Sequence, residues 1–245
     1  MRAPIRMKGH AGQQPATVYR PVLACGFARR LTPAARDRLL ALGPESRFRP
    51  GDFLLHEGHR SDHVLFLVRG RVKTTSAADN GYAVVLGIRG PGDVVGEMAC
   101  LGGHPRSATV SALDPVLART ISGTEFRRFV SREPGAGLAL AELIASRLRA
   151  ANRRRLEFGA FSVRRRLALI LVDLERWHGV SEPGDENRRD IDLALSQADL
   201  AGLVGSSLEA AAKAIRELAS QGVIRTRRRH VTILDCAALQ QIAGQ

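Results

Sequence analysis

The spacing of hydrophobic and polar positions changes twice along this 245-residue chain. Between about Phe27 and Phe129, short apolar runs alternate with turn pairs such as Pro50-Gly51 and Arg69-Gly70. Runs of this length, rich in β-branched residues and cut by glycine, are typical of strands. We therefore expect a small antiparallel β-roll, preceded by a helix that Thr32 caps. The predicted strands cover residues 52–55, 63–68, 71–75 and 83–88.

After Pro134 the period becomes helical, and no Gly or Pro interrupts residues 138–157. Apolar or small residues recur there at alternating steps of three and four, which is the stagger of a coiled-coil seam. We expect one long helix that pairs with a second copy of the chain, with Asn152 fixing the register. Packing within its own chain is the alternative. The seam positions are Leu138, Ala141, Ala145, Leu148, Asn152 and Arg155.

The C-terminal third combines helical and strand patterns. An amphipathic helix over 163–177 and a polar linker over 181–187 precede Ser196 to Asp199, which form a capping box. Gly205 ends that short helix, and a second helix begins after Ser207. Two strands, 223–226 and 230–234, then enclose a triple-arginine turn. This order predicts a helix-turn-helix followed by a wing.

Residues 96–110 place a carboxylate, a glycine-rich bend and an Arg-Ser pair in one short segment. Arginine binds phosphate oxygens through a charge-assisted fork, and backbone N–H groups with a serine hydroxyl complete an anion site. A glutamate can accept the hydroxyl of a ribose. The segment therefore suits a cyclic nucleotide.

This segment resembles the phosphate-binding cassette of the cyclic-AMP receptor protein (CRP/FNR) family of bacterial transcription regulators. The glycine-punctuated strands and the winged helix resemble the same family. The resemblance implies an α+β fold with a jelly-roll-like β-roll, a central dimerisation helix and a DNA-binding domain. We expect a disordered basic arm over 1–20, the β-roll over 21–133, the central helix and hinge over 134–160, and the winged helix-turn-helix over 161–245.

The resemblance also implies a set of ligand contacts. Ala151-Asn152 stands where the family often has Thr-Ser or Thr-Asn beside the base, so a threonine hydroxyl is missing. Cyclic AMP is favoured over cyclic GMP, although both stay open. The expected ligand-binding residues are Gly96, Glu97, Met98, Ala99, Arg106, Ser107, Ala108, Arg147, Ala151 and Asn152.

The DNA-reading helix departs from the family pattern at one position. The family begins this helix with a Ser-Arg-Glu type triplet, and here Leu208 replaces the arginine. A leucine donates no hydrogen bond to guanine, so we expect a different target sequence or lower specificity. The expected DNA-binding residues are Gln197, Ser206, Ser207, Leu208, Glu209, Lys213, Arg227, Arg228 and Arg229.

Composition supports an anionic partner. The formal net charge is +13 with a sequence pI of about 11.2, and arginine supplies most of the cations. Double-stranded DNA is the leading partner, with RNA polymerase a further candidate. Three distant cysteines suggest neither a disulfide framework nor a zinc site. No apolar run is long enough to span a bilayer, and we expect a cytoplasmic protein without membrane contact.

Other chemistry has weaker support. Three histidines at 56, 59 and 63 lie close together in the sequence, but their spacing does not ensure that they meet at one metal, and we expect none. No nucleophile or Walker-type motif indicates an enzyme, and we expect no catalytic residue. The alternatives are a regulator that is constitutive or senses another ligand, a metal-bearing enzyme of the cupin type, and a nucleotide-binding module that does not read DNA.

Overall fold

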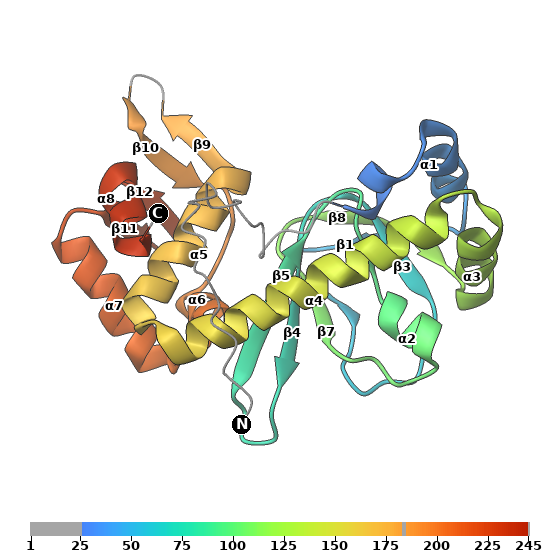
Figure 1. Ribbon diagram of the computed structural model, residues 1–245, viewed down its shortest axis with the longest axis horizontal. Helices are drawn as coiled ribbons and strands as arrows, with labels where there is room; N and C mark the ends of the chain where they lie inside the picture. The colour runs from blue at the N-terminus through green and yellow to red at the C-terminus, as the bar shows by residue number, and fades with distance from the viewer. Residues whose placement is uncertain (1–25, 183–184, 245) are drawn as a thin grey trace, which may run out of the picture.

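A computed structural model of the chain describes residues 26–182 and 185–244. The basic arm expected over 1–20 and Cys25 lie outside these residues. Figure 1 shows two bodies joined by one long helix, with the N-terminal half on the right and the C-terminal half on the left. The fold is α+β, as the sequence predicts.

Two four-stranded antiparallel sheets form the N-terminal β-roll, in the orders β1-β8-β3-β6 and β2-β7-β4-β5. Their facing sides enclose apolar side chains, among them Leu65, Leu67 and Val110. The strands are β1 (Glu45–Phe48), β2 (Phe53–Leu55), β3 (Val64–Arg69), β4 (Val72–Ala77), β5 (Ala83–Arg89), β6 (Val94–Val95), β7 (Thr109–Ala112) and β8 (Val116–Ile121). All four expected strands are present.

A β-bulge interrupts the pairing of β4 with β5. Thr74 lies opposite Gly87, whereas Thr75 lies opposite Val85, so Leu86 is the extra residue. A bulge changes which side chains share a face. As a result Val85 and Ile88, three residues apart, both join the apolar core of the C-terminal half.

Helices close one end of the roll. They are the 3₁₀ turn η1 (Phe27–Arg30), α1 (Pro33–Leu40), α2 (Glu97–Gly102), α3 (Gly123–Arg132) and the start of α4 (Ala136–Ala160). Thr32 caps α1 as expected, and a capping box of Ser122 and Glu125 begins α3. Phe27 and Phe126 meet in the core between these helices and the roll.

The long helix α4 confirms the uninterrupted helical pattern after Pro134. Its buried face, which includes Leu140 and Leu143, packs on the roll. Seam residues lie on another face, and Leu138 and Leu148 are 67% and 60% exposed. Contacts within the chain therefore bury one face of α4 and leave the leucines of the seam exposed.

The C-terminal half is a helix-turn-helix with a wing. It contains α5 (Val163–His178), α6 (Gln197–Val204), α7 (Leu208–Ser220) and α8 (Cys236–Ala243) around one apolar core. Its sheet, in the order β11-β12-β10-β9, contains β9 (Gly179–Glu182), β10 (Asp185–Ile191), β11 (Ile224–Arg227) and β12 (His230–Ile233). Ser196 and Asp199 form the expected capping box, and Gly205 ends α6 with φ 61°.

The linker expected over 181–187 is wrong in part. Residues 181–182 belong to β9 and residues 185–187 to β10, and β10 also pairs with the wing strand β12. The polar composition of this segment gives no alternation of apolar and polar residues, so it carries no strand signal in the sequence.

Candidate functional site

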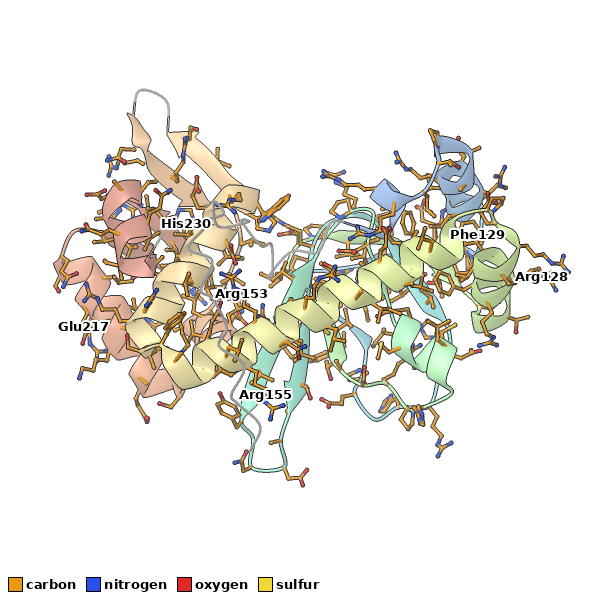
Figure 2. All side chains as sticks on the ribbon, in the orientation of Figure 1. Arg128, Phe129, Arg153, Arg155, Glu217 and His230 are labelled. Carbon is orange, nitrogen blue, oxygen red and sulfur yellow. The ribbon has the colours of Figure 1, made fainter. Side chains whose placement is uncertain are left out.

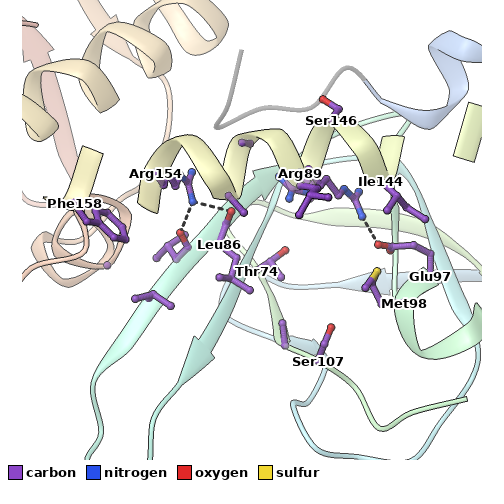
Figure 3. Close-up of a pocket in the computed structure, with 18 residues that line it drawn as sticks. Thr74, Leu86, Arg89, Glu97, Met98, Ser107, Ile144, Ser146, Arg154 and Phe158 are labelled. Atoms are coloured by element: carbon purple, nitrogen blue, oxygen red, sulfur yellow. Dashed lines mark hydrogen bonds and ion pairs between the residues drawn. The ribbon is translucent and has the colours of Figure 1, made fainter. Parts of the chain in front are cut away.

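A cavity of about 600 Å³ lies between the β4–β5 sheet, α4 and α6. Its walls are mostly apolar at the end near α6 and charged at the end near α2 (Figure 3). Strands of the roll, the long helix α4 and the C-terminal half all contribute to one site. The C-terminal half, with α5 to α8 and β9 to β12, is called the reader domain below. The lining residues of the cavity are Thr74, Val84, Val85, Leu86, Arg89, Glu97, Met98, Ser107, Ala108, Ile144, Ser146, Arg147, Leu148, Ala150, Ala151, Arg154, Phe158 and Gly202.

A second cavity of about 60 Å³ adjoins the first. Thr74, Arg89, Glu97, Met98, Ser107, Ala108 and Arg147 line both, whereas Arg106 and Gly96 line only the smaller one. Both cavities share the charged residues Arg89, Glu97 and Arg147, and the larger one extends along mostly apolar residues towards α6. This suits a ligand with a small anionic end and a larger flat end.

Arg106 is fixed at the wall of the smaller cavity. It is 3% exposed, and its guanidinium donates to Ser61 Oγ at 2.9 Å, Gly96 O at 2.9 Å and His63 O at 2.7 Å. All three acceptors are uncharged. Burial lowers the pKa of Arg106, because desolvation disfavours the charged form. A bound phosphate would offset that cost with a full negative charge.

Gly96 makes this position of Arg106 possible. A Cβ at residue 96 would lie 2.6 Å from Nη1 of Arg106, and the residue adopts φ 88°. Any side chain would both strain the backbone and displace the guanidinium. Gly96 therefore acts by making room for Arg106.

Glu97 and Arg147 join α2 to the long helix across the cavity. Nη1 of Arg147 lies 2.5 Å from Oε1 of Glu97, a contact that Figure 3 marks with a dashed line. Nη2 of Arg147 donates to Val94 O at 2.8 Å. Burial opposes the charge of Arg147, but Glu97 and Asp93 outweigh it and raise its pKa. The pair fixes a buried carboxylate where a ribose hydroxyl can be bound.

Arg89 adds a further cation that sequence reasoning missed. It ends β5, is buried and lines both cavities, and its Nη1 donates to Ile88 O at 3.0 Å. Burial, followed by the charge of Arg147, lowers its pKa to about 10. A Cβ on Gly87 would lie 2.3 Å from this guanidinium, so a glycine inside the strand provides its seat.

Nine of the ten expected ligand-binding residues line one or both cavities. Asn152 does not, and its side chain is exposed on α4. The other lining residues that sequence reasoning missed include Arg154, Phe158, Gly202 and three positions of β5. A charge at the end of an apolar strand could have identified Arg89, but only the packing of two domains places Gly202 at the cavity.

The expected DNA-binding residues form a separate, exposed surface. On α7 the side chains of Leu208, Glu209 and Lys213 are exposed, while Ala214 and Leu218 are buried. Figure 2 shows this half with Glu217 on α7 and His230 on the wing. Gln197, Ser207, Arg227, Arg228 and Arg229 are also exposed, and Ser206 is half-buried.

The wing turn places arginines at its tip. Arg228 and Arg229 connect β11 to β12, and Arg229 adopts φ 57°. A positive φ is unusual outside glycine, asparagine and aspartate. The tight turn therefore projects charge at an energetic cost, which is common at functional positions.

Polar contacts connect the reader domain to the roll beside the cavity. Lys73 on β4 pairs with Asp199, the capping-box residue of α6. Arg71 pairs with Asp114 of the roll and donates to the main chain of Asp192. A Cβ on Gly202 would lie 2.9 Å from Val85, so α6 packs closely against β5. The wall of the cavity is thus tied to the helix-turn-helix.

Comparison with known proteins agrees with this architecture. Residues 45–133 match the cyclic nucleotide-binding domain, and residues 165–242 match the Crp-like helix-turn-helix domain. The CRP-like cAMP-activated global transcriptional regulator of Mycobacterium tuberculosis is 29% identical over 80% of this chain and 86% of its own. The chain belongs to the CRP/FNR family.

Solved structures place this CRP/FNR chain among the same regulators. A CRP/FNR family transcriptional regulator from Thermus thermophilus is 25% identical, with a TM-score of 0.69 over 82% of this chain and 99% of its own. The cyclic AMP receptor protein of that organism is 26% identical over 87% of this chain and 94% of its own. The family comprises transcription regulators, not enzymes.

Two further findings concern the described residues of this family member. Among residues 26–182 and 185–244, no three His, Cys, Asp or Glu side chains are arranged to hold a metal ion. No helix in the part of the chain that the structure describes is long and apolar enough to cross a membrane.

Proposed function

We propose that the chain is a homodimeric transcription regulator whose DNA binding is controlled by a cyclic nucleotide. The observation that carries this is the arrangement of Arg106, Ser107, Glu97 and Arg147 around two adjoining cavities. Arg106 with Ser107 would take the phosphate, and Glu97 the ribose. The base would lie in the larger cavity beside α4.

The exposed seam of α4 supports the homodimer. The seam residues Leu138 and Leu148 are 67% and 60% exposed, and Ala141 lies between them. A second copy of the helix would cover these side chains and bring two recognition helices together. In a dimer of this kind they meet successive major grooves, roughly 34 Å apart.

The walls of the cavity connect nucleotide binding to the placement of the reader domain. Arg147 on α4 bonds to Glu97, and Gly202 of α6 lines the larger cavity. A nucleotide that contacts α4 and α6 would bind one placement of the reader domain better than another. That difference in affinity is what shifts the population towards the DNA-binding arrangement.

The exposed arginines support DNA as the partner. Arg227, Arg228 and Arg229 project from the wing beside a recognition helix with Lys213 on its open face. Such cations neutralise backbone phosphates and give salt-dependent affinity. With Leu208 in place of an arginine, we expect a target that includes a thymine methyl or a cytosine amino contact.

Isothermal titration of the purified full-length chain with cyclic AMP and cyclic GMP tests the effector. We expect saturable binding that Arg106→Ala weakens strongly. The sequence favours cyclic AMP, and the relative named as cAMP-activated supports that order. No heat with either nucleotide would contradict the proposal.

A second candidate function is a regulator of this family that is constitutive or senses another ligand. The hydrogen bonds of Arg106 to Ser61 and to two main-chain carbonyls favour it, because they would stabilise the loop without a phosphate. Under this alternative, Arg106→Ala would lower the melting temperature while DNA affinity stayed independent of nucleotide.

A further inference from the structure

Two arginines at the cavities have no carboxylate partner. Arg89, Arg106 and Arg147 all line the smaller cavity. Arg147 forms ion pairs with Glu97 and Asp93, whereas no carboxylate among the described residues lies within ion-pair distance of Arg89 or Arg106. A buried cation without a counter-ion is costly, so both of these arginines are suited to bind an anionic group of a ligand.

Arg89 has more unused donors than Arg106. Each side-chain nitrogen of Arg106 donates to a protein oxygen, whereas in Arg89 only Nη1 does so, to Ile88 O at 3.0 Å. Nε and Nη2 of Arg89 have no hydrogen-bond partner in the described part of the chain. Protein does not enclose these two atoms, whereas it encloses the same two atoms of Arg154. Arg89 therefore presents free donors to the cavities that it lines.

The strand β5 provides the seat for this guanidinium. A Cβ at Gly87 would lie 2.3 Å from Nη1 of Arg89 and 2.9 Å from Nη2, so only a glycine leaves the space. Glycine inside a strand often marks such a close approach. The pKa of Arg89, although lowered, is about 10, so the group is charged at neutral pH.

Arg89 and Arg106 approach the ligand from different sides. Arg106 belongs to the loop before β7, whereas Arg89 ends β5 and is close enough to Arg147 and Arg154 of α4 for their charges to act on it. Figure 3 shows Arg89 beside α4 and Ser107 across the cavity from it. A ligand in these cavities would therefore lie between two cations.

We infer that Arg89 binds phosphate oxygens of the ligand, as a second cation besides Arg106. The inference rests on the proposed binding of a cyclic nucleotide. A phosphate supplies the negative charge that a neutral base lacks, and its oxygens match the fork of an arginine. Two kinds of ligand meet this requirement. In a cyclic mononucleotide the single phosphate would lie between the two arginines, and in a cyclic dinucleotide a second phosphodiester would meet Arg89.

Replacing Arg89 in the full-length chain tests the contact. Arg89→Met keeps an unbranched side chain and removes the charge, whereas Arg89→Lys keeps a charge without the fork. For the ligand whose phosphate meets Arg89, Arg89→Met should weaken binding about tenfold to a hundredfold, which is the usual loss for hydrogen bonds to a charged group. Arg89→Lys should weaken it several-fold. Titration calorimetry with cyclic AMP, cyclic GMP, cyclic di-AMP and cyclic di-GMP measures the affinities.

The four nucleotides identify which phosphate Arg89 binds. If it is the phosphate of a mononucleotide, Arg89→Met should weaken cyclic AMP and cyclic GMP by the same factor. If it is a second phosphate, the parent chain should bind a cyclic dinucleotide more tightly than either mononucleotide, and Arg89→Met should weaken the dinucleotide alone. Both results support the inference.

A contact with the base predicts another pattern. Arg89→Met would then change the affinities for cyclic AMP and cyclic GMP by unequal factors, because the two purines present different donors and acceptors. That result would overturn the inference. Unchanged affinity for all four nucleotides would overturn it as well, and would leave Arg89 a purely structural residue.

A control variant and thermal melting complete the experiment. Arg128 on α3 is exposed and distant from the cavities in Figure 2, so Arg128→Gln should leave every affinity unchanged. Thermal melting shows whether each variant is folded, and Arg89→Lys decides the matter if Arg89→Met is not. Nucleotide binding that neither Arg89 variant alters would overturn this inference alone. No binding of any of the four nucleotides to the parent chain would overturn the proposed function with it.

Discussion

The arginines of the cavity and the arginines of the wing differ in how exposed they are and in how firmly hydrogen bonds hold their guanidinium groups in one orientation. Arg106 is 3% exposed and has three short hydrogen bonds to named acceptors. Arg227 and Arg228 on the wing are exposed. A buried, oriented cation recognises one anionic group in one geometry, whereas exposed cations attract any polyphosphate and are screened by salt. Under the proposed function, the same residue type would serve recognition of a phosphate in one half and attraction of DNA in the other.

Replacing Arg106 is expected to have the largest effect, because it removes the buried arginine that would bind the phosphate. Arg106→Ala removes a charge-assisted contact and should weaken nucleotide binding by about 1.5–3 kcal/mol. Titration calorimetry measures the loss. The Arg106→Ala variant should keep the salt dependence of DNA binding in the absence of nucleotide, because Arg106 is not part of the expected DNA-binding surface. Unchanged nucleotide affinity would remove the phosphate assignment.

Replacing Gly202 tests the junction between the two regions. A Cβ there would meet Val85 at 2.9 Å and main-chain atoms of β5 at 3.1–3.2 Å, so Gly202→Ala should cost about 1–3 kcal/mol of stability. Thermal unfolding measures it. Gly137→Ala in α4, where a Cβ would meet Val130 O at 3.6 Å, is the matched control and should be neutral or slightly stabilising. Equal melting temperatures for the two variants would show that α6 does not pack closely on β5.

Replacing the wing arginines tests the exposed side. Changing Arg227, Arg228 and Arg229 together to glutamine should weaken binding to all DNA sequences alike. The slope of log affinity against log salt should fall by ~0.9 for each DNA phosphate that the variant no longer neutralises. Filter binding at several salt concentrations measures this slope. A change in sequence preference with an unchanged slope would instead make these arginines base readers.

A pH experiment examines the smallest effect, at the contact of Arg71 with the reader domain. His178 lies 3.5 Å from Arg71, and burial, followed by this charge, lowers the pKa of His178 to about 4. Between pH 4 and 6.5 the unfolded chain therefore binds the extra proton, and stability rises with pH through this window.

The comparison of His178→Gln with the parent chain isolates this effect. Burial raises the pKa of Asp173 to about 6, and this carboxyl acts in the opposite sense, stabilising the folded chain as pH falls below 6. The variant should lose about 1 kcal/mol less than the parent between pH 7 and 5, allowing for the partial exposure of His178. Denaturant unfolding at both pH values measures the difference. Equal losses of unfolding free energy in the variant and the parent would show that His178 does not cause the pH dependence.

The sequence predicts much of the fold because local signals decide it. Strand-length apolar runs, the seam of α4 and the caps at Thr32 and Ser196 each act within a few residues. The strands β9 and β10 were not predicted, because their polar composition gives no apolar alternation and because β10 also pairs with β12, about forty residues further along the chain.

The cassette was predictable for the same local reason, since Glu97 and Arg106 lie in one segment. Arg89, Arg154 and Gly202 were not, because their places depend on a bulge in β5 and on the packing of α6 against it. Residues that a tertiary contact brings to a site leave no periodic signal in the sequence.

The central claim is that nucleotide in the buried cavity changes DNA binding at the exposed surface. DNA fragments selected with the full-length chain allow its affinity to be measured at fixed salt, with and without saturating cyclic GMP or cyclic AMP. We predict that nucleotide changes the affinity of the parent chain by about 5-fold to 150-fold, the usual range of such coupling, and leaves that of Arg106→Ala unchanged. The same DNA affinity with and without either nucleotide would contradict the account.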